Sequence, residues 1–287
     1  MIWILLPVFN EEGSLPRLLP KIENSIKNIG FEYRIVVVND GSRDKTSLVL
    51  QGYTNILPLD IIDHVINRGL GETERDGFEY IASRCDNDDI VIRMDCDDTH
   101  EPRYFLYLIE QIMNGYDVVI ASRFKPGGGQ KGVNVYRALV SYFANLFMKM
   151  VFGVKGVREY SCGYRAYRGH AIKYAVKIFG NGFIQLKGLG FTSTLETVIK
   201  LNLLGCKFTE IPFVLRYDQK VGNSKMVSSV TTIGYLVMAL LYHWPFGGWK
   251  IFYRNLSKTY NESKEEAIRK YAYCNKKKTA ACRIGGG

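Results

Sequence analysis

The sequence predicts an α/β fold, in which a mostly parallel β-sheet has helices on both faces. Apolar runs rich in Val and Ile predict five strands, near Ile2–Phe9, Tyr33–Asn39, Asp60–Val65, Asp89–Met94 and Asp117–Ala121. Helical patterns separate these runs, so strand and helix alternate five times. Strands that are apolar along almost their whole length are typical of a sheet covered on both faces.

The first helix is predicted behind Ser14, a residue type that often caps helix N-termini. Its apolar residues recur at helical spacing, at Leu15, Leu18, Leu19, Ile22 and Ile26. The later strands end in the same way as the first, with a polar cluster. These clusters are Asn10 and Glu11 after the first strand, Asn39, Asp40, Gly41 and Ser42 after the second, Asp95, Asp97 and Asp98 after the fourth, and Ser122 and Arg123 after the fifth.

Each polar cluster taken alone is typical of a turn. However, parallel strands bring their carboxyl ends to one edge of a sheet, where ligands bind in α/β proteins. Four clusters at one edge therefore predict a ligand site.

The segment MDCDDTH, Met94–His100, carries three of these acids directly after a β-branched run. In an alternating strand Asp95 and Asp97 share one face, while Asp98 points away. Mg²⁺ and Mn²⁺ prefer carboxylate and water oxygens and keep positions open for phosphate oxygens. The segment predicts a divalent metal site at Asp95 and Asp97; the alternative is a solvated acidic turn. His100 is a weaker candidate ligand.

The composition suits one domain with a tail: 287 residues, 47% of them hydrophobic, with a net charge of +10. Such a charge indicates an anionic partner, which is nucleic acid, anionic lipid or substrate phosphate. Nucleic acid is disfavoured, because the chain has no zinc-finger spacing or RNA-binding aromatic motif. The six cysteines show no metal-ligand spacing, and the N-terminus enters a strand without signal-peptide features, which predicts a cytosolic environment.

The segment from Met226 to Trp249 contains no Lys, Arg, Asp or Glu. Its strongly apolar part is shorter than the ~20 residues of a spanning helix, so we expect a helix at 227–249 that lies in the membrane interface. A spanning helix and a helix packed on the protein's own core are the alternatives. Ala138–Phe152 is a second apolar helix, and residues 250–287 are predicted to form a basic tail.

Eight segments then follow one another in a recognisable order. They are PVFNEEGSL, VVVNDGSRDKT, NRGLGETERDGF, MDCDDTHEP, ASRFKPGG, SCGYRAYR, GFTSTLE and EIPFVLRYDQKVGNSKM. This series resembles family 2 glycosyltransferases, and within them the dolichol-phosphate mannose synthase group, over about 1–226. The resemblance implies a Rossmann-like GT-A fold, a nucleotide-sugar donor, a divalent metal (Mg²⁺ or Mn²⁺) and inversion at the anomeric carbon.

The resemblance also implies roles for individual residues. Around the base and ribose it places Pro7, Phe9, Glu11, Val38 and Asp40. It places Asp95 near the ribose and metal, and makes Asp97 a metal ligand. Near the donor diphosphate or acceptor phosphate it places Arg123, Arg137 and Lys225. The chain departs from the family pattern at Asn39, Thr99 and Thr192, where Asp, Gln and Lys are common, and Lys220 or Arg216 replaces a basic residue that has no match in register.

The predicted function is transfer of a sugar from GDP-mannose or a UDP-sugar to a polyprenyl or dolichyl phosphate, at the cytoplasmic face of a membrane. One alternative is a hydroxyl acceptor, which requires a base to take its proton; Glu196 is the leading candidate. Another is a catalytically weak membrane-bound scaffold of the same fold. A nucleotidyltransferase is disfavoured, because PVFNEEG stands where a Gly-rich phosphate loop is expected.

Overall fold

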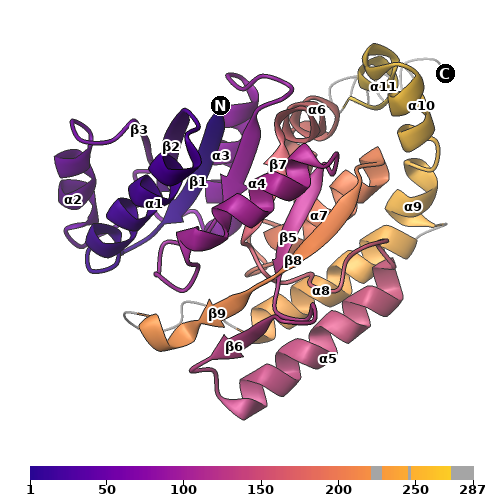
Figure 1. The fold of residues 1–287 in the computed structure, drawn as a ribbon. Coiled ribbons are helices and arrows are strands. Elements are labelled where there is room, and N and C mark those ends of the chain that lie inside the picture. The colour runs from indigo at the N-terminus through magenta and orange to yellow at the C-terminus, as the bar shows by residue number, and fades with distance from the viewer. Residues whose placement is uncertain (221–227, 245–246, 273–287) are drawn as a thin grey trace.

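The computed structural model describes residues 1–220, 228–244 and 247–272 (Figure 1). Strands and helices alternate through its first half as the sequence predicts. In chain order these elements are β1 (Ile2–Val8), α1 (Leu15–Ile29), β2 (Tyr33–Asn39), α2 (Thr46–Tyr53), β3 (Leu59–Asp63), α3 (Leu70–Ala82), β4 (Ile90–Arg93), α4 (Phe105–Met113) and β5 (Val118–Ser122). The second half contains β6 (Gly129–Lys131), α5 (Val135–Phe152), β7 (Arg165–Arg168), α6 (Gly169–Phe179), α7 (Ser193–Leu204), β8 (Phe208–Pro212), β9 (Val214–Arg216), α8 (Ser228–His243), α9 (Gly248–Phe252), α10 (Leu256–Glu262) and α11 (Lys264–Tyr271).

Seven strands form the central sheet, in the order β3-β2-β1-β4-β7-β5-β8. Neighbouring strands are parallel except at β7, which runs antiparallel to both β4 and β5. The prediction of a mostly parallel sheet is therefore confirmed. Strands β7 and β8 lie outside the five predicted strands, since the four residues of β7, RAYR, include two arginines and those of β8, FTEIP, form no apolar run.

Two apolar cores lie on opposite faces of this sheet. Leu5 and Val36 belong to the core that contains residues of α3, α6 and α7, whereas Ile4 and Ile35 belong to the core that contains residues of α1 and α4. The alternation follows from the two-residue period of a strand. All five apolar positions predicted for α1 are buried. Ser14 precedes this helix, but its hydroxyl contacts Glu11 rather than a backbone N–H of the helix.

Helices α5 and α8 lie along the lower side of the molecule in Figure 1, beside the small β6–β9 sheet. One face of α8 packs on the core through Met238 and Tyr242, which are buried. Its other face exposes apolar side chains, as does much of α5. These exposed side chains are Val135, Tyr136, Leu139, Val140, Tyr142, Phe143, Leu146 and Met150 on α5, and Ile233, Leu236 and Leu240 on α8. We call this set the apolar face.

The helix predicted at 227–249 is thus partly a core helix, because α8 buries one of its sides. Within the described ranges, no helix combines the length and apolar character that crossing a membrane requires. The segment predicted as a basic tail from residue 250 is helical over much of its described part. Residues up to Tyr271 form helices, and Leu256 of α10 and Ala267 of α11 are buried in the core shared with α6 and α7. Of the predicted tail, residues 273–287 lie outside the residues that the structure describes.

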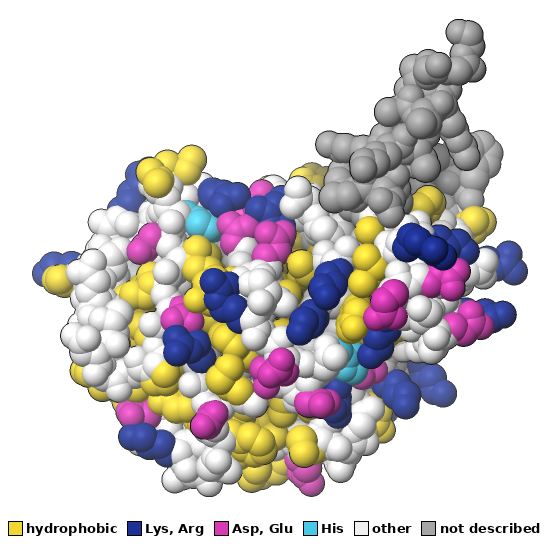
Figure 2. Space-filling model, turned by 90° about the horizontal axis from the view of Figure 1, so that it is seen from above, with side chains coloured by type: hydrophobic (Ala, Val, Ile, Leu, Met, Phe, Trp, Pro, Cys, Tyr) yellow, Lys and Arg dark blue, Asp and Glu magenta, His cyan; other side chains and the backbone are white. Residues whose placement is uncertain are grey.

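The face at the top of Figure 1 carries a mixture of charges. Figure 2 views the molecule from that side and shows acidic and basic side chains interspersed with apolar ones. The net positive charge of the chain therefore does not form a single basic surface on this face.

Candidate active site

A cavity of about 590 Å³ lies beyond the carboxyl ends of β1, β2, β4 and β5, with further walls from α5 and α8. Eight of the residues predicted for the site line it: Pro7, Phe9, Glu11, Asp40, Asp95, Asp97, Arg123 and Arg137. Val38 does not line it. Its side chain is buried in the sheet core, close to Gly77 of α3, so it contributes to packing. Lys225 falls outside the described residues.

At one end of the cavity Asp40 organises the loop between β3 and α3. Its Oδ1 accepts a hydrogen bond from the backbone N–H of Arg68 at 2.8 Å, and its Oδ2 accepts one from Gly69 at 2.8 Å. His64 Nδ1 lies 2.7 Å from Oδ1, and His64 Nε2 lies 3.1 Å from Asp76. The same loop passes so close to Gly41 that a Cβ there would lie 2.5 Å from the backbone of Ile66. A β-carbon at position 41 would therefore displace this wall.

The acidic segment is a loop, because β4 ends at Arg93. Asp95 and Asp97 line the cavity, whereas Asp98 adopts a positive φ of 63° and pairs with Lys21 of α1 at 2.7 Å. The prediction that Asp98 points away from the other two acids is correct, but strand alternation is not the reason. The left-handed turn at Asp98 separates them.

Asp95 is held by a buried arginine. Arg93 lies 2.5 Å from Asp95 and 2.6 Å from Glu74 of α3, and both Arg93 and Glu74 are almost fully buried. Burial alone would raise the pKa of Asp95, but Arg93 and His100 lower this pKa to about 2. The Asp95 carboxylate is therefore anionic across the physiological pH range and fixed in position.

Asp97 has two partners. The Thr99 hydroxyl donates a hydrogen bond to Asp97 Oδ1 at 2.6 Å, and the Lys220 ammonium contacts Oδ2. Burial opposes the charge on Lys220, yet Asp97 and Asp95 raise the pKa of this lysine above its usual value. The negative charge of Asp97 is thus balanced by Lys220 in this structure.

Asp95 and Asp97 fit a Mg²⁺ or Mn²⁺ ion that takes its other ligands from water and phosphate. Among the described residues, no group of three or more His, Cys, Asp or Glu side chains is placed to hold a metal. His100 is buried, stacks on Tyr164 with ring centroids 5.0 Å apart, and accepts a hydrogen bond from the Asp95 N–H at 3.0 Å. Burial lowers the pKa of His100. These contacts indicate that His100 holds the acidic loop in place.

The basic side of the cavity depends on Glu159, which sequence reasoning missed. Arg123 donates two hydrogen bonds to the Glu159 carboxylate, both 2.8 Å, and a third to Ser161 at 2.8 Å. Glu159 is 0% exposed; burial opposes its charge, but Arg123 and Ser161 lower its pKa. Across the cavity, Arg137 Nη1 donates to the Tyr217 hydroxyl at 3.0 Å. The SCGYRAYR motif begins at Ser161, just after Glu159, and was the nearest available signal.

Glu196 does not line the cavity. It is 0% exposed, and its Oε2 accepts backbone hydrogen bonds from Gln185 at 2.9 Å and Leu186 at 3.0 Å. Burial raises its pKa, although Lys200 opposes this rise. These contacts are those of a structurally paired Glu, which was the alternative to a catalytic base. Thr192 has a similar structural role, since its hydroxyl donates to the Leu186 carbonyl at 2.9 Å.

The cavity has an apolar end as well. Tyr136, Val140 and Ala144 of α5 line it, and Tyr235 of α8 lies opposite. Tyr136 is 74% exposed and belongs to the apolar face, as does Val140. The cavity wall therefore continues onto the outer surface of α5.

Comparisons with known proteins show which family and which fold the chain is similar to. The sequence model of the family described as glycosyl transferase family 2 matches residues 3–174. A dolichol-phosphate mannosyltransferase of Pyrococcus furiosus is 28% identical over 224 residues, which cover 78% of this chain and 58% of that protein. An undecaprenyl-phosphate 4-deoxy-4-formamido-L-arabinose transferase of Pseudomonas paraeruginosa is 30% identical over 194 residues, covering 64% of this chain and 54% of that protein. The chain thus spans little more than half the length of these relatives.

Two solved structures share the fold. Glucosyl-3-phosphoglycerate synthase from Mycobacterium tuberculosis, crystallised with Mn²⁺, UDP and glucosyl-3-phosphoglycerate, is 14% identical with a TM-score of 0.55, covering 84% of this chain and 78% of its own. A second mycobacterial protein is also 14% identical, with a TM-score of 0.58 and coverage of 84% and 73%. At this identity the likeness establishes the fold class.

Proposed function

This chain belongs to glycosyl transferase family 2, and from that premise we propose that it transfers a sugar from a nucleotide-sugar donor to a polyprenyl phosphate, with inversion at the anomeric carbon. One observation carries the proposal. A single cavity has acidic and basic side chains at its inner end and an apolar helical wall that continues onto the surface. Such a cavity suits a charged diphosphate and a lipid acceptor at the same time.

The donor end of the cavity suits a nucleoside. Pro7 and Phe9 supply apolar walls for a base, and Glu11 offers carboxylate oxygens to ring N–H groups or ribose hydroxyls. Asp40 acts chiefly by holding the 64–69 loop, whose backbone forms part of the wall. We assign GDP-mannose or a UDP-sugar as the donor class.

Asp95 and Asp97 would hold the divalent ion, Mg²⁺ or Mn²⁺. When bound, such an ion neutralises negative charge on the leaving diphosphate. The use of Mn²⁺ with UDP in the crystals of the mycobacterial synthase supports this choice. Lys220 contacts Asp97 and would move aside or share the carboxylate, and Thr99 keeps Asp97 in place by its hydrogen bond.

The protein's own groups position the reactants and stabilise charge. As the bond to the nucleoside diphosphate breaks, Arg123, held rigidly by Glu159, presents a fixed positive charge to the cavity. Arg137 lies on α5 beside the apolar end, where it can dock the acceptor phosphate. A phosphate acceptor is already anionic near pH 7, so it needs orientation rather than a strong general base. Lys225 remains a proposed member of this basic set.

A hydroxyl acceptor is the second candidate, and it would require a base at the cavity. The burial of Glu196 away from the cavity argues against this residue as that base and so favours a phosphate acceptor. The third candidate, a catalytically weak scaffold, rests on Asn39 and Thr99. Both have structural partners here: Asn39 Nδ2 donates to Asp63 at 2.8 Å, and Thr99 orients Asp97.

The apolar face supports action at a membrane surface, with α5 and α8 in contact with the lipid interface. Exposed apolar side chains gathered on neighbouring helices are typical of sites of association. Since the donor would be a cytoplasmic nucleotide sugar, we propose the cytoplasmic side. We take residues 1–226 as the transferase domain, with α10 and α11 completing its core, and α8 contributes both to this core and to the apolar face.

The test is incubation of the protein with radiolabelled nucleotide sugars and a panel of polyprenyl phosphates and polyprenols, followed by extraction into organic solvent. Radiolabelled sugar should enter the organic solvent only when a polyprenyl phosphate is present. The labelled product should resist phospholipase and be cleaved by acid. Transfer to a polyprenol instead would establish the hydroxyl acceptor. No transfer with any donor, from protein that still binds UDP or GDP, would favour the scaffold.

A further inference from the structure

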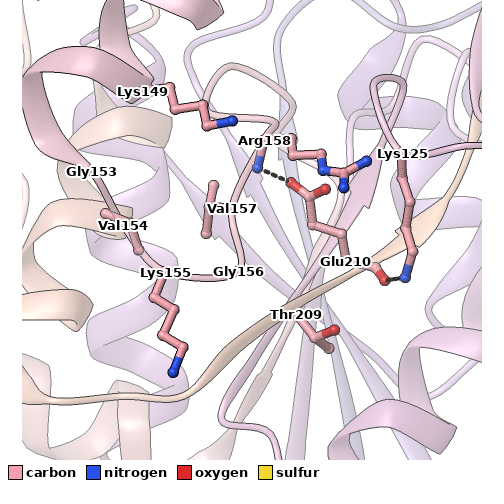
Figure 3. Close-up of a pocket in the computed structure, with 10 residues that line it drawn as sticks. All are labelled: Lys125, Lys149, Gly153, Val154, Lys155, Gly156, Val157, Arg158, Thr209 and Glu210. Carbon is pink, nitrogen blue, oxygen red and sulfur yellow. Dashed lines mark hydrogen bonds between the residues drawn. The ribbon is translucent and has the colours of Figure 1, made fainter.

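A second cavity, of about 510 Å³, lies outside the candidate active site (Figure 3). It is formed by the end of α5, the loop 153–158 that follows, the residue Lys125 and the first half of β8. None of its lining residues also lines the larger cavity. Four of them are cationic, namely Lys125, Lys149, Lys155 and Arg158, and one is acidic, Glu210.

The carboxylate of Glu210 binds the backbone of the 153–158 loop and its neighbour Glu159 rather than the cationic side chains. Glu210 is 4% exposed, and its Oε1 accepts hydrogen bonds from the backbone N–H groups of Arg158 at 2.6 Å and Glu159 at 2.7 Å. Lys125 donates to the backbone carbonyl of Glu210, not to its carboxylate. Within the described part of the chain, no salt bridge joins any of the four cations to a carboxylate.

The pocket is rigidly built. Val154 and Val157 of the loop are buried in the sheet core. Gly156, with φ of +83°, passes so close to β8 that a Cβ would lie 2.6 Å from the Phe208 carbonyl oxygen. Figure 3 shows Lys149 reaching from the end of α5 toward Arg158, whereas Lys155 points away from both of them on the other side of the loop. Lys149 and Arg158 therefore bring two positive charges to one side of the pocket, and Lys155 adds a third at its other side, so an anion in the pocket would be attracted by all three.

We propose that this pocket is a second anion site, which binds a phosphate group distinct from that of the sugar donor or the acceptor. Its volume accommodates inorganic phosphate or a phosphoglycerol headgroup. Lys149 lies roughly 18 Å along α5 from Arg137, because each helical residue adds about 1.5 Å. The apolar residues Phe143, Leu146 and Met150 are exposed along this stretch. A phosphate held here by a lipid would place its acyl chains beside the apolar face.

The phosphate therefore comes either from an anionic lipid headgroup or from a soluble phosphate compound, and the experiment separates the two. Full-length protein is floated with vesicles of phosphatidylcholine alone or mixed with phosphatidylglycerol, and it is titrated calorimetrically with inorganic phosphate and with glycerol 3-phosphate. The variant replaces two exposed lysines of the pocket, Lys149→Gln with Lys155→Gln. A matched control replaces two exposed lysines elsewhere, Lys27→Gln with Lys258→Gln.

A basic residue near an anionic surface contributes about a fivefold gain in partitioning, so the pocket variant should bind phosphatidylglycerol vesicles roughly 30-fold more weakly. The control should change binding by less than about threefold. Loss on vesicles without loss in the phosphate titration assigns the site to a headgroup, and loss in both assigns it to the phosphate group itself. Retention of binding by Lys149→Arg with Lys155→Arg would show that charge is what the site uses. Equal losses in pocket variant and control, or no binding by either probe, would overturn the proposal.

Discussion

The buried pair of Glu159 and Arg123 gives the clearest test of how the candidate site is held together. Glu159→Gln removes the charge but keeps the shape of the side chain. In the native chain this carboxylate accepts hydrogen bonds from Arg123, from the N–H and hydroxyl of Ser161, and from the N–H of Cys162. Breaking a buried ion pair by removing one partner costs about 3–5 kcal/mol, because the other charge is left uncompensated.

That cost converts into a melting temperature. Unfolding entropy of about 2.1 cal/mol/K per residue gives roughly 0.6 kcal/mol/K for 287 residues, so Tm should fall by about 5–8 °C. The measurement is thermal unfolding followed by circular dichroism at pH 7. As a control, Glu262→Gln removes an exposed acid that lies 3.8 Å from Lys258, and should shift Tm by less than about 1 °C.

The pH dependence provides a second check on the same variant. The pKa of Glu159 lies below its ordinary value of 4.5 in the folded protein. Its ionised form therefore stabilises the fold above pH 4.5, and this contribution is lost as the pH falls below that value. The Tm of Glu159→Gln should depend less on pH in that acidic range than the Tm of the native protein. An unchanged pH profile, or a Tm within about 1 °C of native at pH 7, would refute the reasoning.

Three further predictions concern function. Asp97→Asn should lower sugar transfer by ~10²-fold or more while leaving the fold intact, and activity that survives both this change and EDTA would contradict a metal-dependent reaction. Leu236→Ser with Leu240→Ser, both exposed on α8, should weaken flotation with liposomes, whereas Leu48→Ser, exposed elsewhere, should not. Arg137→Ala should raise the KM for a short polyprenyl phosphate with donor binding near normal in calorimetry; loss of donor binding instead would move Arg137 to the donor.

Strands β1, β2, β4 and β5 were predictable because most of their residues are buried. Burial on both faces leaves an uninterrupted apolar run, and the predicted Tyr33–Asn39 matches β2 residue for residue. The edge of the fold was less predictable. The small strands β6 and β9 contain polar residues and depend on each other for pairing, so neither has a signal of its own.

The cavity was predictable where a side chain directly follows a strand, as at Asp40 or Asp95. Val38 was placed beside the pocket by the family resemblance, which does not say where its side chain points; here that side chain is buried in the sheet core. Glu159, Arg93 and His64 were missed for a different reason. Each acts through a partner that is distant in sequence or on another element, such as Arg123 for Glu159 and Glu74 for Arg93, and a single sequence carries no sign of these pairings.

The antiparallel strand β7 has a consequence for the order in which the protein forms. Strand β5 pairs only with β7 and β8, both of which come later in the chain. A nascent chain that has emerged from the ribosome as far as Ser122 thus carries Asp95 and Asp97 on a sheet whose growing edge is β4. Arg123 can pair with Glu159 only after the chain has been made as far as the segment before β7, so the loops that carry Asp40, Asp95 and Asp97 can fold during synthesis before the basic side of the cavity is assembled.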